Sequence, residues 1–109
     1  MIHVKIKETS GRISSFEMSG HADFAEHGQD LVCAGASAVS FGAVNAIMEL
    51  TGIEPQISQT ESGYLQVGFP DDLDAETDGQ VQLLVRGMIV SLKTIEQDYE
   101  EYIKITFTA

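Results

Sequence analysis

The residues of this sequence best suited to chemistry are its single cysteine, Cys33, and a histidine twelve positions before it, His21. A thiol attacks as its thiolate, and a free pKa near about 8.5 leaves little anion at neutral pH unless the surroundings lower that pKa. A neighbouring imidazole can take the thiol proton and later return it. The two residue types together therefore predict nucleophilic catalysis.

The segment that begins at Cys33 predicts a helix that ends near Thr51. Its apolar residues recur at helical spacing, and Gly52 follows as a stop signal. That stripe comprises Ala36, Val39, Ala43, Ile47 and Leu50. A thiol in the first helical turn faces unpaired N–H groups and the positive end of the helix dipole, so we expect its pKa to be lowered. Because Ala34 and its neighbours are small, the backbone N–H groups of that turn are also candidates for an oxyanion hole.

The three histidines differ in how firmly the chain would hold them. His3 alternates with apolar residues on the strand face of two lysines, which is typical of a solvated surface histidine. His21 follows Gly20 at the end of a predicted strand, and a strand end is a more rigid mount than a loop. His27 lies within the loop that follows. We therefore expect His21 to be the base and leave the role of His27 open.

Asp30 and Ser37 are possible supporting residues. Asp30 could orient His21 or cap the helix by accepting backbone N–H bonds, and its place shortly before the helix favours the cap. Ser37 lies one turn after Cys33, where either substrate contact or packing is open to it, and its small size favours packing.

Two other interpretations of Cys33 remain open on spacing alone. One is a buried, inert cysteine among small neighbours. The other is a metal site formed by His21, His27, Asp30 and Cys33, but tight pairs such as Cys-x-x-Cys are missing. The sequence therefore predicts no metal and no other cofactor.

The elements that would position these residues predict an α+β fold. Period-two alternation predicts strands over 2–7, 12–19, 56–59, 64–69 and 102–108, and helical periodicity predicts helices over 33–51 and 74–97. The order is strand, strand, helix, strand, strand, helix, strand, which favours an antiparallel or mixed sheet of about five strands with both helices on one face. Residues 20–32 form a loop of the length that often carries function. We expect residues 1–109 to form a single domain.

Composition narrows the classes of partner. The chain carries 17 acidic and 6 basic residues, a formal charge of −11, which opposes direct binding to nucleic acid and favours a basic partner. The alternative is that the acidic runs are simply solvated helix ends. The apolar stretch from Leu31 to Leu50 contains Ser37, Asn45 and Glu49, so we expect no membrane span and a cytoplasmic protein.

Several motifs resemble one known family. They are Gly20-His21-Ala22, then Gly28-x-Asp30-x-Val32-Cys33-Ala34-Gly35-Ala36-Ser37-Ala38, the steps Phe41-Gly42 and Val44-Asn45, and Met88-x-x-Ser91-Leu92-x-Thr94-Ile95. Over essentially its whole length the sequence resembles the bacterial ribosomal-processing cysteine proteases called Prp. The family's catalytic histidine and cysteine match His21 and Cys33, and Asp30 also matches its motif.

The resemblance implies an activity and a substrate. Members of this family remove a short N-terminal extension from a protein of the bacterial large ribosomal subunit, cutting at a hydrophobic motif that contains phenylalanine. It also implies a homodimer and a mobile loop over the active site, here about residues 22 to 32, with Gly28 as a candidate hinge. Two readings from other classes stay open, namely a ribosome-associated binding module without catalysis and a redox-sensing thiol protein.

Overall fold

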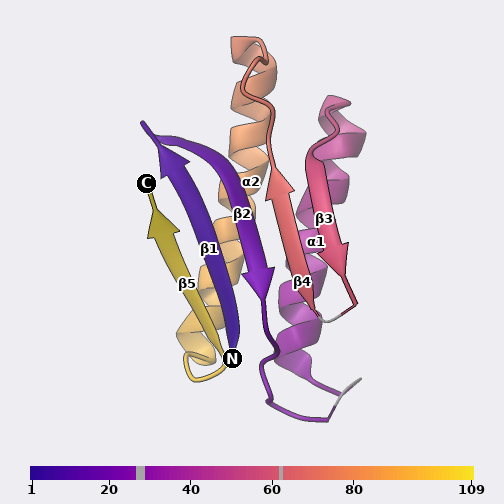
Figure 1. Cartoon of the computed structure of the whole chain (residues 1–109), viewed down its shortest axis with the longest axis vertical. Coiled ribbons are helices and arrows are strands. Elements are labelled where there is room, and N and C mark those ends of the chain that lie inside the picture. Colours follow the sequence, from indigo (N-terminus) through magenta and orange to yellow (C-terminus); the bar gives the residue numbers. More distant parts are fainter. Residues whose placement is uncertain (27–28, 62) are drawn as a thin grey trace.

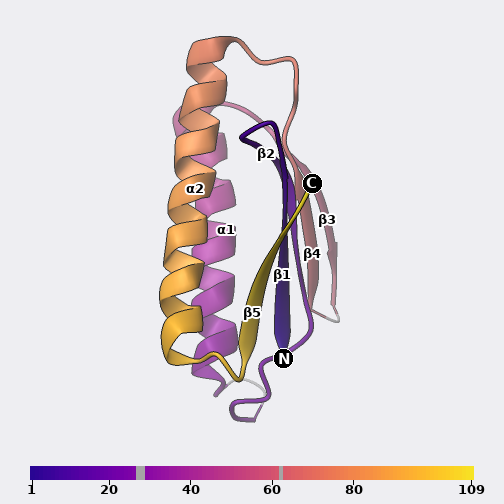
Figure 2. The same cartoon turned by 90° about the vertical axis from the view of Figure 1, so that its left-hand side faces the viewer.

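The computed structural model of the chain describes residues 1–26, 29–61 and 63–109. Its elements are β1 (Ile2–Thr9), β2 (Arg12–Ser19), α1 (Leu31–Thr51), β3 (Gln56–Thr60), β4 (Tyr64–Gly68), α2 (Ala75–Asp98) and β5 (Ile103–Thr108). The strands form one sheet in the order β3-β4-β2-β1-β5 (Figure 1). Both helices cover the same face of that sheet (Figure 2). The predicted α+β class, the element order and the placement of the helices are confirmed.

The sheet is mixed because the first strand and the last strand, β1 and β5, pair in parallel while the other pairs are antiparallel. Consecutive strands pair antiparallel, as β1 with β2 and β3 with β4, whereas β5 lies parallel to β1. On the strands β1 and β2, alternate side chains such as Val4, Ile6 and Phe16 are buried under the helices. The other face of the sheet carries exposed polar residues such as Lys5. The period-two alternation of the sequence therefore reflects a sheet with one buried face.

Helix α1 begins two residues earlier than the sequence predicted, at Leu31 instead of Cys33. The reason is Asp30, whose extended backbone and carboxylate acceptor make it the N-cap. Its buried face also differs from the predicted stripe, since it comprises Val32, Ala36, Ser40, Val44 and Ile47. Leu50 is 71% exposed, so the prediction that it faces the core was wrong.

By length and composition, α1 is apolar enough to cross a membrane, a test that core helices of soluble proteins also pass. In the structure α1 packs against α2 and places Val44 and Ile47 in the hydrophobic core. Ser40 on the same face is fully buried and its hydroxyl lies 3.7 Å from the Met18 sulfur. We therefore describe α1 as a packed helix of this fold.

Candidate active site

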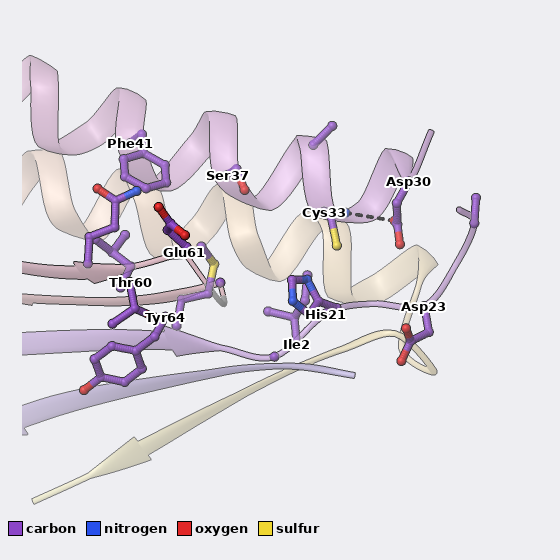
Figure 3. A pocket seen from close by; sticks show the side chains of 17 residues that line it. Ile2, His21, Asp23, Asp30, Cys33, Ser37, Phe41, Thr60, Glu61 and Tyr64 are labelled. Atoms are coloured by element: carbon purple, nitrogen blue, oxygen red, sulfur yellow. Dashed lines mark hydrogen bonds between the residues drawn. The ribbon is translucent and has the colours of Figure 1, made fainter. Parts of the chain in front are cut away.

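A pocket of about 630 Å³ opens at the end of the sheet where β2 stops and α1 begins. Cys33 and Ser37 reach it from α1, His21 from the residues after β2, and Thr60, Glu61 and Tyr64 from β3, β4 and the turn between them (Figure 3). Apolar side chains complete the lining, namely Ile2, Met18, Phe41 and Leu65. The structure thus brings His21, Asp30, Cys33, Ala34 and Ser37 together on one pocket.

Asp30 fixes the start of the helix that carries the thiol. One carboxylate oxygen accepts the N–H groups of Val32 and Cys33, each at 3.0 Å, and the other accepts the N–H of Phe24 at 3.0 Å. Burial alone would raise the pKa of Asp30, but the N–H groups of Cys33 and Phe24 outweigh it and hold the pKa below its usual value. The cap predicted for Asp30 is therefore present, and it also ties the preceding loop to the helix.

The thiol of Cys33 is half-buried, and its sulfur accepts the N–H of Ala22 at 3.3 Å. Burial raises the pKa of Cys33 above its usual value; the Ala22 N–H opposes this, and the charges of Asp30 and Asp23 add to it. The sequence predicted a lowered pKa from the helix terminus alone. Burial of the thiol, with the negative charge of the capping carboxylate beside it, thus shifts the pKa in the opposite direction to the one predicted.

The N–H groups expected to form an oxyanion hole already have partners. Cys33 donates to the Asp30 carboxylate, and Ala34 donates to the Asp30 carbonyl oxygen at 3.0 Å. An N–H at a helix start can share its hydrogen between two acceptors. A substrate oxygen would therefore be bound by these groups only as a second acceptor.

His21 is exposed and enters the pocket directly after the turn at Gly20. A side chain on Gly20 would overlap the Met1 carbonyl oxygen, which explains why glycine precedes the histidine. Ser37 is half-buried and its side chain lies along the pocket wall one turn after Cys33 (Figure 3). Substrate contact and packing therefore both stay open to Ser37, and the packing role that the sequence favours stays a prediction.

Sequence reasoning missed one wall of the pocket. Thr60, Glu61 and Tyr64 belong to a hairpin whose first strand is exposed throughout. No motif or spacing links these residues to Cys33, and only the pairing of β4 with β2 brings them near it.

Two predictions fall wholly or partly on residues that the structure leaves undescribed. His27 and the candidate hinge Gly28 lie outside the described residues. Within 1–26, 29–61 and 63–109, no group of three or more histidine, cysteine or acidic side chains is arranged to hold a metal ion.

A half-buried thiol near a helix start and an imidazole on the same pocket are the pairing that cysteine hydrolases use, and comparison with known proteins puts the chain in that class. The family model described as cysteine protease Prp matches residues 1–104. The chain belongs to this family.

Named relatives agree over nearly full length. The ribosomal processing cysteine protease Prp of Bacillus subtilis strain 168 is 54% identical over 108 residues, covering 97% of this chain and 96% of the relative. The Prp of Staphylococcus aureus strain Mu50 is 43% identical over 98 residues, 89% of each chain.

Solved structures agree in fold. A crystal structure of the essential ribosomal processing protease Prp from S. aureus with a covalently linked product peptide has a TM-score of 0.90 and 42% identity, covering 99% of this chain and all of that one. The same S. aureus protease with a substrate peptide has a TM-score of 0.85 and 40% identity at the same coverage.

Proposed function

We propose that this chain is a cysteine endopeptidase that removes the N-terminal extension of a bacterial large-subunit ribosomal protein, with Cys33 as nucleophile and His21 as base. The observation that carries the proposal is that both residues line one pocket at the start of α1. Family membership and the relatives named as ribosomal processing proteases support the reaction and the substrate class. In the S. aureus relative, a covalently linked product peptide supports attack by a protein nucleophile.

The raised pKa of Cys33 decides how attack begins. Because burial raises the pKa of Cys33 and so favours the thiol over the thiolate, the proton moves to the His21 imidazole as sulfur bonds to the scissile carbonyl carbon. The carbonyl oxygen becomes an oxyanion, which the N–H groups of Cys33 and Ala34 stabilise as shared donors. This makes His21 a general base, as opposed to the partner of a preformed thiolate.

The remaining steps return the site to its starting state. The tetrahedral intermediate collapses, the C–N bond breaks, and the imidazolium gives its proton to the departing amine. Water then attacks the thioester with His21 accepting its proton, and Cys33 leaves as the thiol after that proton returns to sulfur. Asp30 holds the helix start, and Ser37 lies where it can contact the peptide.

The lining suits the substrate class. Ile2, Met18, Phe41 and Leu65 offer apolar contacts to aliphatic or aromatic peptide side chains. The net charge of −11 attracts a basic ribosomal protein and opposes direct contact with nucleic acid. We also propose a homodimer in the cytoplasm, which light scattering of the purified protein and cell fractionation would test.

The test uses a large-subunit ribosomal protein with its natural N-terminal extension as substrate, read by mass spectrometry. The parent should cut one bond, whereas Cys33→Ala and His21→Ala should each lose at least about a hundredfold in rate. His3→Ala is the matched histidine control, because His3 is exposed on β1 and lies outside the pocket lining. Binding without cleavage would favour the binding module, and a thiol that only responds to oxidant would favour the redox sensor.

A further inference from the structure

The turn between β3 and β4 lies at the same end of the sheet as His21. β2 and β4 are antiparallel, with Phe16 opposite Val67 and Met18 opposite Leu65. Continued by two residues beyond Met18, this register sets Gly63 opposite Gly20 and so beside His21. The register thus explains a contact between residues more than forty positions apart.

The contact leaves no space for a side chain at Gly63. A Cβ atom there would lie 2.9 Å from Cε1 and 3.2 Å from Nε2 of His21, and 3.4 Å from the Gly20 carbonyl oxygen. Non-bonded carbon atoms prefer about 3.5–4.0 Å. One edge of the His21 imidazole therefore occupies the volume that any other residue at position 63 would need.

We propose that Gly63 is a positioning residue for His21, because its bare α-carbon forms the wall against which the imidazole lies. The inference rests on the proposed function, in which His21 is the base. It adds that the β3–β4 turn sets where this base stands relative to Cys33, and that Gly63 acts through the position of His21.

A side chain at this position should affect catalysis more than folding. The nearest atoms are the far end of an exposed side chain, so the imidazole can rotate away at small cost to stability. A general base must stay within hydrogen-bond reach of the proton that it takes. A displacement of about 1 Å in a catalytic geometry can cost about a hundredfold in rate.

The chain offers a matched control in its other described tight turn. Gly11 lies in the β1–β2 turn with a φ of 79°, and Gly63 has a φ of 85°. A Cβ at Gly11 meets nothing within 4 Å. Alanine imposes the same left-handed backbone strain at both sites, so the difference between the two variants isolates the contact with His21.

The experiment compares Gly63→Ala with Gly11→Ala in the cleavage assay. We expect kcat of Gly63→Ala to fall about 10- to 100-fold with a smaller change in KM, because His21 handles the proton and does not hold the peptide. Gly11→Ala should stay within about twofold of the parent, while both lose similar thermal stability. The Cε1–H resonance of His21 should shift in Gly63→Ala and not in Gly11→Ala.

A second substitution guards against misfolding. Asparagine tolerates left-handed backbone better than alanine, so Gly63→Asn should fold at least as well and still lose kcat. Equal kcat in the Gly63 and Gly11 variants, or an unmoved His21 resonance, would overturn the inference while leaving the proposed function intact. A parent that cleaves nothing would overturn the proposed function, and with it the catalytic meaning of the contact.

Discussion

Both helices of this protein begin at an aspartate, yet the two caps do different work. Asp74 is exposed, and its carboxylate accepts one N–H, that of Thr77 at 3.0 Å. Asp30 is only 9% exposed and accepts three, from Val32, Cys33 and Phe24. A cap that only starts a helix can stay in solvent, whereas the buried cap also joins the loop before the helix to the turn that carries the thiol.

The first turns of the two helices also differ in their acidic residues. α2 carries Glu76 and Asp78 there, as the positive end of the helix dipole favours. α1 carries no acidic residue in its first turn. Apart from the Asp30 cap, the Cys33 thiol thus lies at the positive end of α1 without an acidic neighbour in the same helical turn.

The largest effect that would sharpen this comparison is expected for Asp30→Ala against Asp74→Ala. Loss of an N-cap generally costs about 0.5–2 kcal/mol of stability. Asp74→Ala should fall within that range, and Asp30→Ala should exceed it, because three N–H groups lose an acceptor at a buried position. Urea unfolding of both variants measures the difference.

The same pair of variants separates a structural cap from one that organises the site. Asp30→Ala should lower kcat at least about tenfold, because the turn that holds Cys33 loosens, and Asp74→Ala should cleave at the parental rate. Equal stability losses together with equal activity would mean that the two caps are equivalent.

A smaller effect is expected on acidification. The folded protein holds the pKa of Asp30 and of Asp74 below the usual value of 3.8. A lowered folded-state pKa contributes stability at pH above the unfolded-state pKa, and that stability is lost as pH falls through the folded-state pKa. The parent should therefore lose stability between pH 6 and pH 3 more steeply than Asp30→Asn or Asp74→Asn.

Paired urea titrations at the two pH values test this linkage. Asp72→Asn, at an exposed position between β4 and α2, is the charge-matched control. A parental slope in both cap variants would show that neither carboxylate contributes to the acid sensitivity of the fold.

The smallest effect concerns the charge around the thiol. Because the carboxylate of Asp23 adds to the raised pKa of Cys33, Asp23→Asn should lower that pKa and raise the thiolate fraction at neutral pH. Alkylation of Cys33 by iodoacetamide at pH 7 should then run about two- to threefold faster. An unchanged rate in Asp23→Asn, with Asp72→Asn as the charge-matched control, would contradict the electrostatic account.

The features of the site that depend on neighbouring residues could be predicted from the sequence, whereas those that depend on tertiary packing could not. The cap at Asp30 could be predicted because N-caps depend on residues within one turn. The pKa of Cys33 could not, since it follows from burial and from charges whose distances depend on packing. Gly63 and Tyr64 reach the pocket through strand pairing, which leaves no spacing signal near Cys33.

The buried face of α1 could be predicted only in part, because it too depends on tertiary packing. α1 packs on the sheet and on α2, so its buried row follows Ser40 and Val44, while the predicted stripe ran through Val39 and Ala43. Because α1 contains many small apolar residues, more than one of its faces could be buried. Packing against α2 and the sheet determines which face is buried.

The parallel pairing of β1 with β5 has a consequence for how the enzyme is made. Ile2 lines the pocket and pairs with Ile103, and its N–H donates to the Tyr102 carbonyl oxygen at 2.8 Å. One wall of the pocket is thus supported by a strand that is synthesised after β1, β2 and α1. A nascent chain that has released β1, β2 and α1 already contains His21 and Cys33, but the sheet that supports them closes only after synthesis reaches β5.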